Sequence, residues 1–161
     1  MHIRSANNSD IEFIIHLCAE HAAFEKVGFN QLDKKQALID LFFIEEALKC
    51  LVVEQENVLV GYATFMRQIS TWDAGYYIYL DCLYLKENIR GQGVGHQLMN
   101  RIKSFAREEN CNTIQWQTPN FNEQAIEFYN RIGATSKTKE RFFLECLTPS
   151  FLRIRSGVFL R

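Results

Sequence analysis

The sequence predicts an α/β fold in which a mixed, mostly antiparallel central sheet is flanked by helices. Segments rich in β-forming residues cluster between positions 50 and 86, and amphipathic segments with helical periodicity stand before and after them. The chain has 161 residues, of which 47% are hydrophobic, so it can bury an ordinary core. We therefore expect one domain over residues 1–161, with a core at about 2–147 and a C-terminal strand or arm at 148–161.

The elements before the sheet are a short strand and two helices. A first strand is expected at residues 2–6, HIRSA. Ser9 and Glu12 match a capping box, which predicts a helix that continues to about Phe24. A second helix is expected from about Asp33, as its N-cap, to Leu48.

The sheet itself is predicted from three long β segments. Residues 50–69 indicate two strands that turn at Glu56 and Asn57, which is typical of an antiparallel hairpin. Residues 75–86, GYYIYLDCLYLK, predict a third long strand. The remaining expected elements are a helix at 95–109, a short strand at 113–118, a helix at 122–133 that ends at Gly133, and a strand at 139–147. For residues 150–161, a strand, a partner-binding arm and a tail all stay open.

Charge and cysteine usage narrow the class of function. The formal net charge is -1, which gives no general attraction for nucleic acid or an anionic membrane, so we expect neither as a partner. No apolar run reaches ~18 residues and the N-terminus lacks a signal-like apolar stretch, so a cytoplasmic location is expected. The five cysteines are dispersed without a C-x-x-C pair, so we expect no disulfide framework and no metal site.

The stretch RGQGVG, residues 90–95, lies between a predicted strand and a predicted helix. A P-loop would need G-K-[ST] where this chain has Gly95 and His96, and a dinucleotide fingerprint would need a glycine at position 96. A third pattern, R/Q-x-x-G-x-G/A, is matched in register by Arg90, Gly93 and Gly95. Such a loop can wrap a pyrophosphate with its N–H groups at the positive end of the helix dipole, and Arg90 can add a charge-assisted bond.

With this loop and the helix NEQAIEFYNRIGA at 122–134, the chain resembles the GNAT acyltransferase superfamily over residues 2–147. The segments AEHAAFEK and TWDAGYYIYLDCLYL resemble the diamine (spermidine/spermine) acetyltransferases and their thialysine-acetylating relatives. The resemblance implies an N-acetyltransferase that uses acetyl-CoA, acts on a primary amine of a small cationic molecule, and forms a homodimer. One departure is that TSKTKERFF lacks the acidic pair that those enzymes carry after the last helix.

Two other functions stay open on the sequence. One is a peptide or protein N-acetyltransferase, and the other is a coenzyme A-binding module without turnover. By the resemblance, the residues expected to contact coenzyme A are Leu83, Tyr84, Leu85, Arg90, Gly91, Gln92, Gly93, Val94, Gly95, His96, Asn122, Ala125, Phe128 and Tyr129.

The chemistry is expected at Asp81 and Tyr129. A primary amine with a pKa near ~10.4 costs roughly 4–5 kcal/mol to deprotonate at pH 7, so a base is needed, directly or through water. Asp81 lies in an otherwise apolar strand, where a carboxylate is expected to be partly desolvated. Tyr129 shares a helix face with Asn122 and can donate a proton to the departing thiolate.

The amine itself is expected to meet acidic and aromatic groups. Glu25 in the first helix, Trp72 and Asp73 before the central strand, and Asp81 are the predicted substrate-binding residues. Cys82 is expected to point away from the site, because adjacent strand residues face opposite sides.

Overall fold

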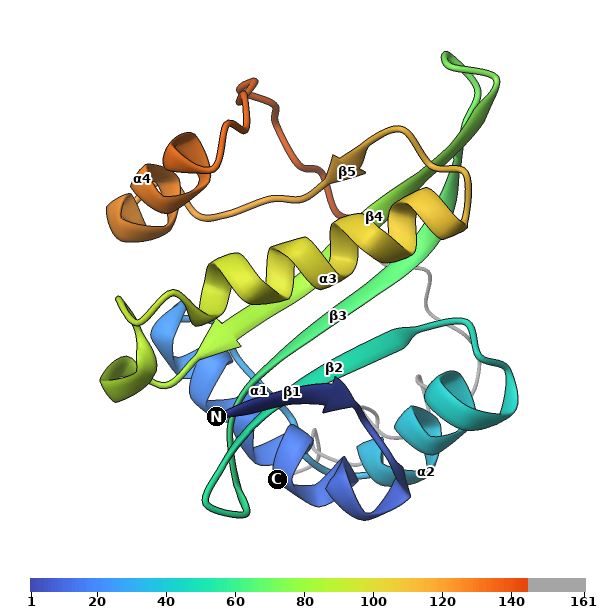
Figure 1. The fold of residues 1–161 in the computed structure, drawn as a ribbon. Helices are drawn as coiled ribbons and strands as arrows, with labels where there is room; N and C mark the ends of the chain where they lie inside the picture. Colours follow the sequence, from blue (N-terminus) through green and yellow to red (C-terminus); the bar gives the residue numbers. More distant parts are fainter. Residues whose placement is uncertain (145–161) are drawn as a thin grey trace, which may run out of the picture.

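The computed structural model describes residues 1–144, which form one sheet with helices on both faces (Figure 1). The strands lie in the order in which they occur along the chain: β1 (His2–Ser5), β2 (Lys49–Gln55), β3 (Val58–Ser70), β4 (Gly75–Leu85) and β5 (Ile114–Gln115). The first four strands pair antiparallel, and β5 pairs parallel to β4. The mixed, mostly antiparallel sheet predicted from the sequence is confirmed.

Within the described part of the chain, four α-helices flank the sheet: α1 (Ile11–Phe24), α2 (Lys34–Ile39), α3 (Val94–Glu108) and α4 (Glu123–Arg131). In Figure 1, α3 lies on one face of the sheet, whereas α1 and α2 lie on the other. No helix within residues 1–144 is long and apolar enough to cross a membrane.

Each face of the sheet has its own apolar core. On the α3 side, Leu98, Met99 and Ile102 pack against sheet residues that include Ile78 and Leu80. On the α1 side, a second core combines helix and sheet residues: Ile11, Ile14, Ile15, Leu17, Phe42, Cys50, Val52, Leu59 and Tyr62. The sheet is therefore covered on both faces.

Strand β4 contains a β-bulge at Asp81. Leu80 pairs with Phe65 and Cys82 pairs with Thr64, so Asp81 has no partner on β3. Before the bulge, even-numbered residues such as Leu80 pack on the α3 side, but after it the odd-numbered Leu83 does so. The extra residue thus exchanges the two faces of the strand, and it turns Cys82 and Tyr84 toward the α1 core.

The start of α1 differs from the predicted capping box. A short 3-10 turn (Asn8–Asp10) precedes the helix and is capped by Asn7, whose backbone N–H donates to Asp10 Oδ2 over 2.8 Å. Arg4 donates to both carboxylate oxygens of the buried Asp10 at 2.6 and 2.9 Å, which lowers the pKa of Asp10 and ties α1 to β1. Glu12, the expected capping partner, instead pairs with Lys35.

Two further predictions about the elements were wrong. The second helix ends at Ile39 and continues only as a π-helical stretch (Asp40–Ile44), and Asp33 has φ of 60° without a side-chain cap. Residues 139–144 form no regular structure, so the described part of the expected strand at 139–147 is not a strand. The segment 150–161 lies outside the described residues.

The hairpin turn and the closing glycine were predicted correctly. Glu56 and Asn57 both have positive φ, at 52° and 64°, as a tight two-residue turn between antiparallel strands requires. Gly133 follows α4 with φ of +85°, the left-handed conformation that glycine adopts most easily.

We expect substitution of Gly61 to weaken the pairing of β3 with β4. A Cβ at this position would lie 2.5 Å from Leu85 Cδ2 and 2.7 Å from the Tyr84 carbonyl oxygen, and a backbone atom cannot easily move. Gly61→Ala should therefore lower the free energy of unfolding by about 2 kcal/mol in urea titrations. Gly28→Ala is the matched control, because no atom lies within 4 Å of that Cβ. Equal stability of the two variants would contradict this packing.

Candidate active site

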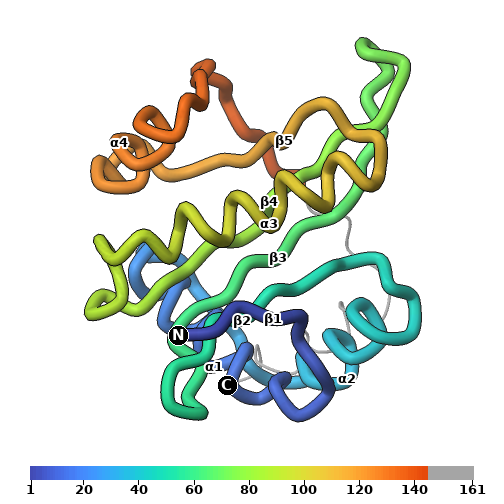
Figure 2. Tube along the Cα trace, in the orientation of Figure 1, coloured from blue at the N-terminus to red at the C-terminus, as the bar shows by residue number. Residues whose placement is uncertain are grey.

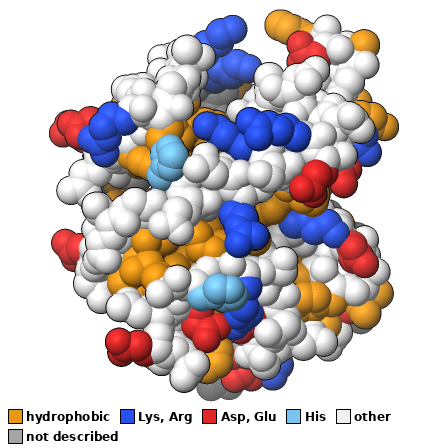
Figure 3. Space-filling view, in the orientation of Figure 1, with side chains coloured by type: hydrophobic (Ala, Val, Ile, Leu, Met, Phe, Trp, Pro, Cys, Tyr) orange, Lys and Arg blue, Asp and Glu red, His pale blue; other side chains and the backbone are white. Residues whose placement is uncertain are grey.

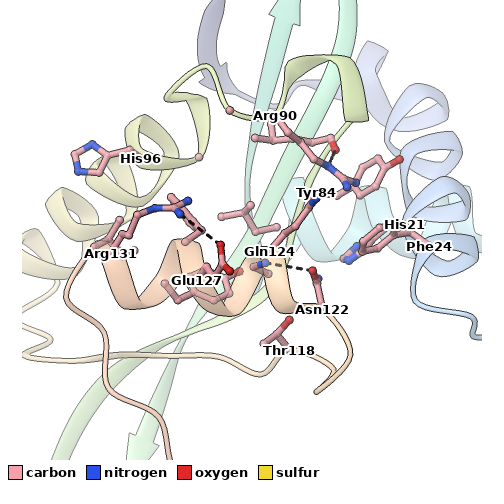
Figure 4. Close-up of a pocket in the computed structure, with 18 of the residues that line it drawn as sticks. His21, Phe24, Tyr84, Arg90, His96, Thr118, Asn122, Gln124, Glu127 and Arg131 are labelled. Atoms are coloured by element: carbon pink, nitrogen blue, oxygen red, sulfur yellow. Dashed lines mark hydrogen bonds and ion pairs between the residues drawn. The ribbon is translucent and has the colours of Figure 1, made fainter.

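A cavity of about 630 Å³ opens where β4 and the chain after β5 separate. The two strands pair only at Ile78 with Ile114 and at Tyr79 with Gln115, and beyond that point they run apart (Figure 2). Residues from α1, β4, the glycine loop, α3 and α4 line the cavity. Figure 4 shows His21 and Phe24 on one side of it and His96 and Arg131 on the other.

The glycine loop brings an uncapped helix end to this cavity. Gly91 and Gly93 have φ of +75° and +79°, so the chain turns there through a conformation that favours glycine. Helix α3 begins at Val94 without any side-chain cap, which leaves its first N–H groups available to a ligand. Together with the helix dipole, this arrangement suits a phosphate or pyrophosphate group.

Gly95 allows α4 to pack closely against α3, because it has no side chain. A Cβ at Gly95 would lie 3.2 Å from Phe128 Cζ, so a larger residue would push Phe128 and α4 away. Arg90, at the start of the loop, contacts both β4 and α1. Its Nε donates to the Leu85 carbonyl over 2.9 Å, and its guanidinium lies 4.6 Å from the centre of the Phe24 ring. The terminal nitrogens of Arg90 have no hydrogen bond among residues 1–144.

Most residues expected to contact coenzyme A do line the cavity, including Arg90, Gly93, Asn122 and Tyr129. Two do not. Val94 is buried in the core on the α3 side, and the exposed Gln92 donates from its side chain to the Asn88 carbonyl. Asn122 also has a structural role, because its side chain accepts from the Ala125 N–H and caps α4.

Asp81 and Tyr129 both face the cavity, from β4 and from α4. Asp81 is exposed, so the expected desolvation of this carboxylate is wrong: the bulge turns it out of the apolar strand. The Tyr129 ring packs against Trp116 at 4.9 Å and Phe128 at 5.2 Å. Burial, followed by the negative charge of Glu25, raises the pKa of Tyr129 to about 12, so the phenol is protonated at neutral pH.

The fold places only two of the four predicted substrate-binding residues in the cavity. Glu25 lines the cavity together with Asp81, but Trp72 and Asp73 do not. They lie in the turn between β3 and β4, at the far end of the hairpin in Figure 1, where Trp72 is 100% exposed and Asp73 is bonded to Ser70. Their expected role in the same pocket does not fit this geometry. Cys82 packs in the α1 core, away from the cavity, as expected.

His21 is the main cavity residue that sequence reasoning missed. Its ring stacks on Tyr84 at 5.2 Å, its Nδ1 lies 3.1 Å from the Tyr62 hydroxyl, and its Nε2 lies 3.3 Å from Glu25 Oε1. Burial lowers the pKa of His21 below its ordinary 6.5, and the charge of Glu25 opposes that shift. Its position four residues before Glu25 on one helix was the available signal. The other cavity residues that were missed are Phe24, Gln117, Thr118, Gln124, Glu127, Arg131 and Ile132.

Comparison with known proteins defines the class. The model of the "Acetyltransferase (GNAT) family" matches residues 15–134. The chain belongs to this family and is an acetyltransferase, and the enzymes of the family take their acetyl group from acetyl-CoA.

The relatives point to particular branches of the family. The chain is 30% identical to thialysine N-epsilon-acetyltransferase of Sus scrofa over 146 residues, which is 85% of each chain. It is 26% identical to the human spermidine/spermine N(1)-acetyltransferase-like protein 1, over 86% of this chain and 21% of that protein.

Solved structures share the fold. An aminoglycoside acetyltransferase from a soil metagenome superposes with a TM-score of 0.75 at 20% identity, over 91% of this chain and 96% of that one. A ribosomal-protein-alanine N-acetyltransferase from Brucella melitensis gives a TM-score of 0.72 at 17% identity, over 90% of this chain and 100% of that one.

We expect the pKa of His21 to depend on the carboxylate of Glu25. Burial lowers the pKa of His21 and Glu25 partly restores it, so Glu25→Gln should lower that pKa further. The measurement is an NMR titration of the imidazole, with the His21 signal assigned by its loss in His21→Gln. A higher pKa of His21 in Glu25→Gln would contradict the electrostatics described here.

Proposed function

We propose that this chain transfers the acetyl group of acetyl-CoA to a primary amine of a small cationic molecule, such as a diamine, a polyamine or an amino-acid-like amine. The observation that carries the proposal is one cavity that joins three features: the uncapped start of α3, the carboxylates of Glu25 and Asp81, and the protonated phenol of Tyr129. Each feature serves a different part of such a transfer.

The α3 end of the cavity fits coenzyme A. Free N–H groups at Val94 and the next residues, with the unpaired guanidinium nitrogens of Arg90, suit its pyrophosphate. The loop and α4 would hold the carrier through Gly91, Gly93 and Asn122, all of which face the cavity. When bound, acetyl-CoA supplies an activated acyl group and a thiolate that leaves.

The α1 end fits the amine. Glu25 and Asp81 bring two carboxylates to this cavity, which favours a cationic group over a neutral or anionic one. The names of the thialysine and spermidine/spermine relatives agree with a cationic amine. Asp81 is exposed and one methylene shorter than glutamate, so we assign it the role of accepting the amine proton through water.

Tyr129 is assigned the role of proton donor to the leaving thiolate. Its raised pKa keeps the hydroxyl protonated throughout the neutral range, and the hydroxyl has no hydrogen-bond partner among residues 1–144. A donor that is not committed elsewhere can turn to the departing sulfur without breaking an existing bond.

Several expectations from the sequence stay predictions. They are the homodimer, the cytoplasmic location and the lack of nucleic-acid and membrane partners. In Figure 3, basic and acidic side chains are interspersed on the face that carries α3, which agrees with the net charge of -1. A peptide or protein acceptor, or coenzyme binding without turnover, is the alternative outcome of the experiment that follows.

The test is thiol release from acetyl-CoA by purified protein with a panel of amines. The panel contains diamines, polyamines, lysine-like amino acids and peptides with a free N-terminus, and mass spectrometry identifies the product. Turnover with the cationic small amines supports the proposal. Turnover with peptides alone, or coenzyme binding without turnover, would overturn it.

Tyr129→Phe should lower kcat about a hundredfold, because the leaving thiolate loses its proton donor. Coenzyme affinity should stay within about twofold, since the ring and its contacts with Trp116 are kept. Steady-state kinetics and calorimetric titration with coenzyme A measure the two quantities. An unchanged kcat would remove Tyr129 from this role.

Asp81→Asn should move the acidic limb of the pH–rate profile or raise the KM for the amine, because it removes a carboxylate from the acceptor side. Asp73→Asn is the matched control, since Asp73 lies in the β3–β4 turn outside the cavity. If the Asp81 variant behaves as the control does, the assignment of Asp81 as the base is wrong.

A further inference from the structure

A buried polar chain runs from the sheet core to the cavity through Tyr62, His21 and Glu25. Tyr62 comes from β3, is 1% exposed, and has its hydroxyl 3.1 Å from His21 Nδ1. The other ring nitrogen, Nε2, lies 3.3 Å from Glu25 Oε1. Exposure of the side chains increases along this series of three residues, to 14% at His21 and 30% at Glu25. The series therefore ends at the surface of the cavity.

The direction of the hydrogen bonds follows from the burial of Tyr62. Burial raises the pKa of this phenol far above its ordinary value, so the hydroxyl keeps its proton. A buried O–H that finds no acceptor costs free energy. The Cys18 and Cys82 thiols also lie beside the Tyr62 hydroxyl, but sulfur is a weak acceptor, and His21 Nδ1 is the stronger acceptor within reach. Tyr62 therefore donates to Nδ1, which must be unprotonated in the neutral imidazole.

This tautomer places the imidazole proton on Nε2, facing Glu25. A neutral histidine has one N–H, so a proton held off Nδ1 resides on Nε2. The Tyr84 ring stacked at 5.2 Å restricts the orientation of the imidazole plane. An N–H held in a fixed direction selects one orientation of the flexible Glu25 side chain, which has three rotatable bonds of its own.

We propose that Tyr62 and His21 are positioning residues for the amine: they fix the imidazole tautomer so that Nε2–H holds the Glu25 carboxylate in the orientation that receives the ammonium group. The inference rests on the proposed function, whose acceptor is a cationic amine. It assigns Glu25 to binding and orientation, and it leaves proton removal to Asp81. Glu25 is thus held ready before the substrate arrives, which reduces the ordering cost of binding.

The charged groups around His21 set a pH dependence of this arrangement. Glu25 faces it from α1, Tyr62 from β3, Tyr84 and Asp81 from β4, and Arg90 from the loop before α3. Protonation of His21 would place a proton on Nδ1 against the Tyr62 hydroxyl and a positive charge beside Glu25. The KM for the amine should therefore rise as pH falls through the pKa of His21, which burial sets below 6.5.

Three variants separate the contributions of Tyr62 and of the two imidazole nitrogens of His21. Tyr62→Phe removes the donor that selects the tautomer. His21→Asn keeps a side-chain amide near the position of Nδ1 but has no N–H that reaches Glu25. His21→Gln keeps an amide N–H near the position of Nε2, where it can still reach Glu25. We expect the KM for the amine to rise roughly tenfold in Tyr62→Phe and His21→Asn, and to stay within about twofold in His21→Gln.

The same variants should leave the kcat and the KM for acetyl-CoA within about twofold of wild type, since neither Tyr62 nor His21 serves the leaving group. His16→Gln, at an exposed histidine on the same helix, is the matched control and should change none of these quantities. The pH dependence of the amine KM should be absent in His21→Gln. If that variant is as impaired as His21→Asn, or if Tyr62→Phe leaves the amine KM unchanged, the positioning role is wrong.

A measurement without turnover keeps this inference separate from the proposed function. Long-range ¹H–¹⁵N NMR of the wild-type protein without substrate at pH 7.5 should show His21 with Nε2 protonated and Nδ1 unprotonated. Tyr62→Phe should shift that signal toward a mixture of tautomers. A wild-type His21 protonated at Nδ1 overturns the positioning chain whatever the amine assay gives, whereas failure of every amine with the expected tautomer overturns only the function of the site.

Discussion

The β-bulge at Asp81 is the constraint on which the rest of the site depends. One unpaired residue in β4 exchanges the faces of the strand, so that Leu80 and Leu83 both pack toward α3 although they are three residues apart. The carboxylate of this bulged residue is thereby turned out of the sheet and into the cavity. The same exchange directs Tyr84 to the α1 side, where His21 stacks on it.

The cavity also depends on the separation of β4 from the segment that follows β5. Only two residue pairs join these strands, so within residues 1–144 the backbone of β4 beyond Tyr79 has no strand paired on that edge. The uncapped start of α3 and one side of α4 both border the resulting gap, and the contact of Gly95 with Phe128 sets how closely the two helices approach. In the proposed function, acetyl-CoA and the amine would share this one cavity.

The sequence was most informative where local chemistry alone determines structure. The long β segments, the turn at Glu56 and Asn57, and the position of the glycine loop between a strand and a helix each depend on neighbouring residues, and each was predicted correctly. The capping box at Ser9 was wrong because Asn7 and Asp10 offer a competing cap that Arg4 stabilises from β1, a partner that local pattern does not reveal. The strand expected at 139–147 failed in its described part, since β-propensity alone supplies no neighbouring strand.

The same limit explains which site residues were missed or misplaced. Trp72 and Asp73 have the right chemistry for a cation, but their distance from the cavity is set by the length of the β3–β4 hairpin, which carries them away. His21 was missed because its two partners come from different parts of the fold, Tyr62 at one ring nitrogen and Glu25 at the other. The C-terminal end of α1 contributes Phe24 to the packing around Arg90, and its C-cap, Glu25, lines the cavity. In the proposed function, the glycine loop binds the pyrophosphate of acetyl-CoA, which is the same whichever amine is acetylated. Discrimination between amines is then assigned to the α1 side chains and to Asp81, which line the same cavity.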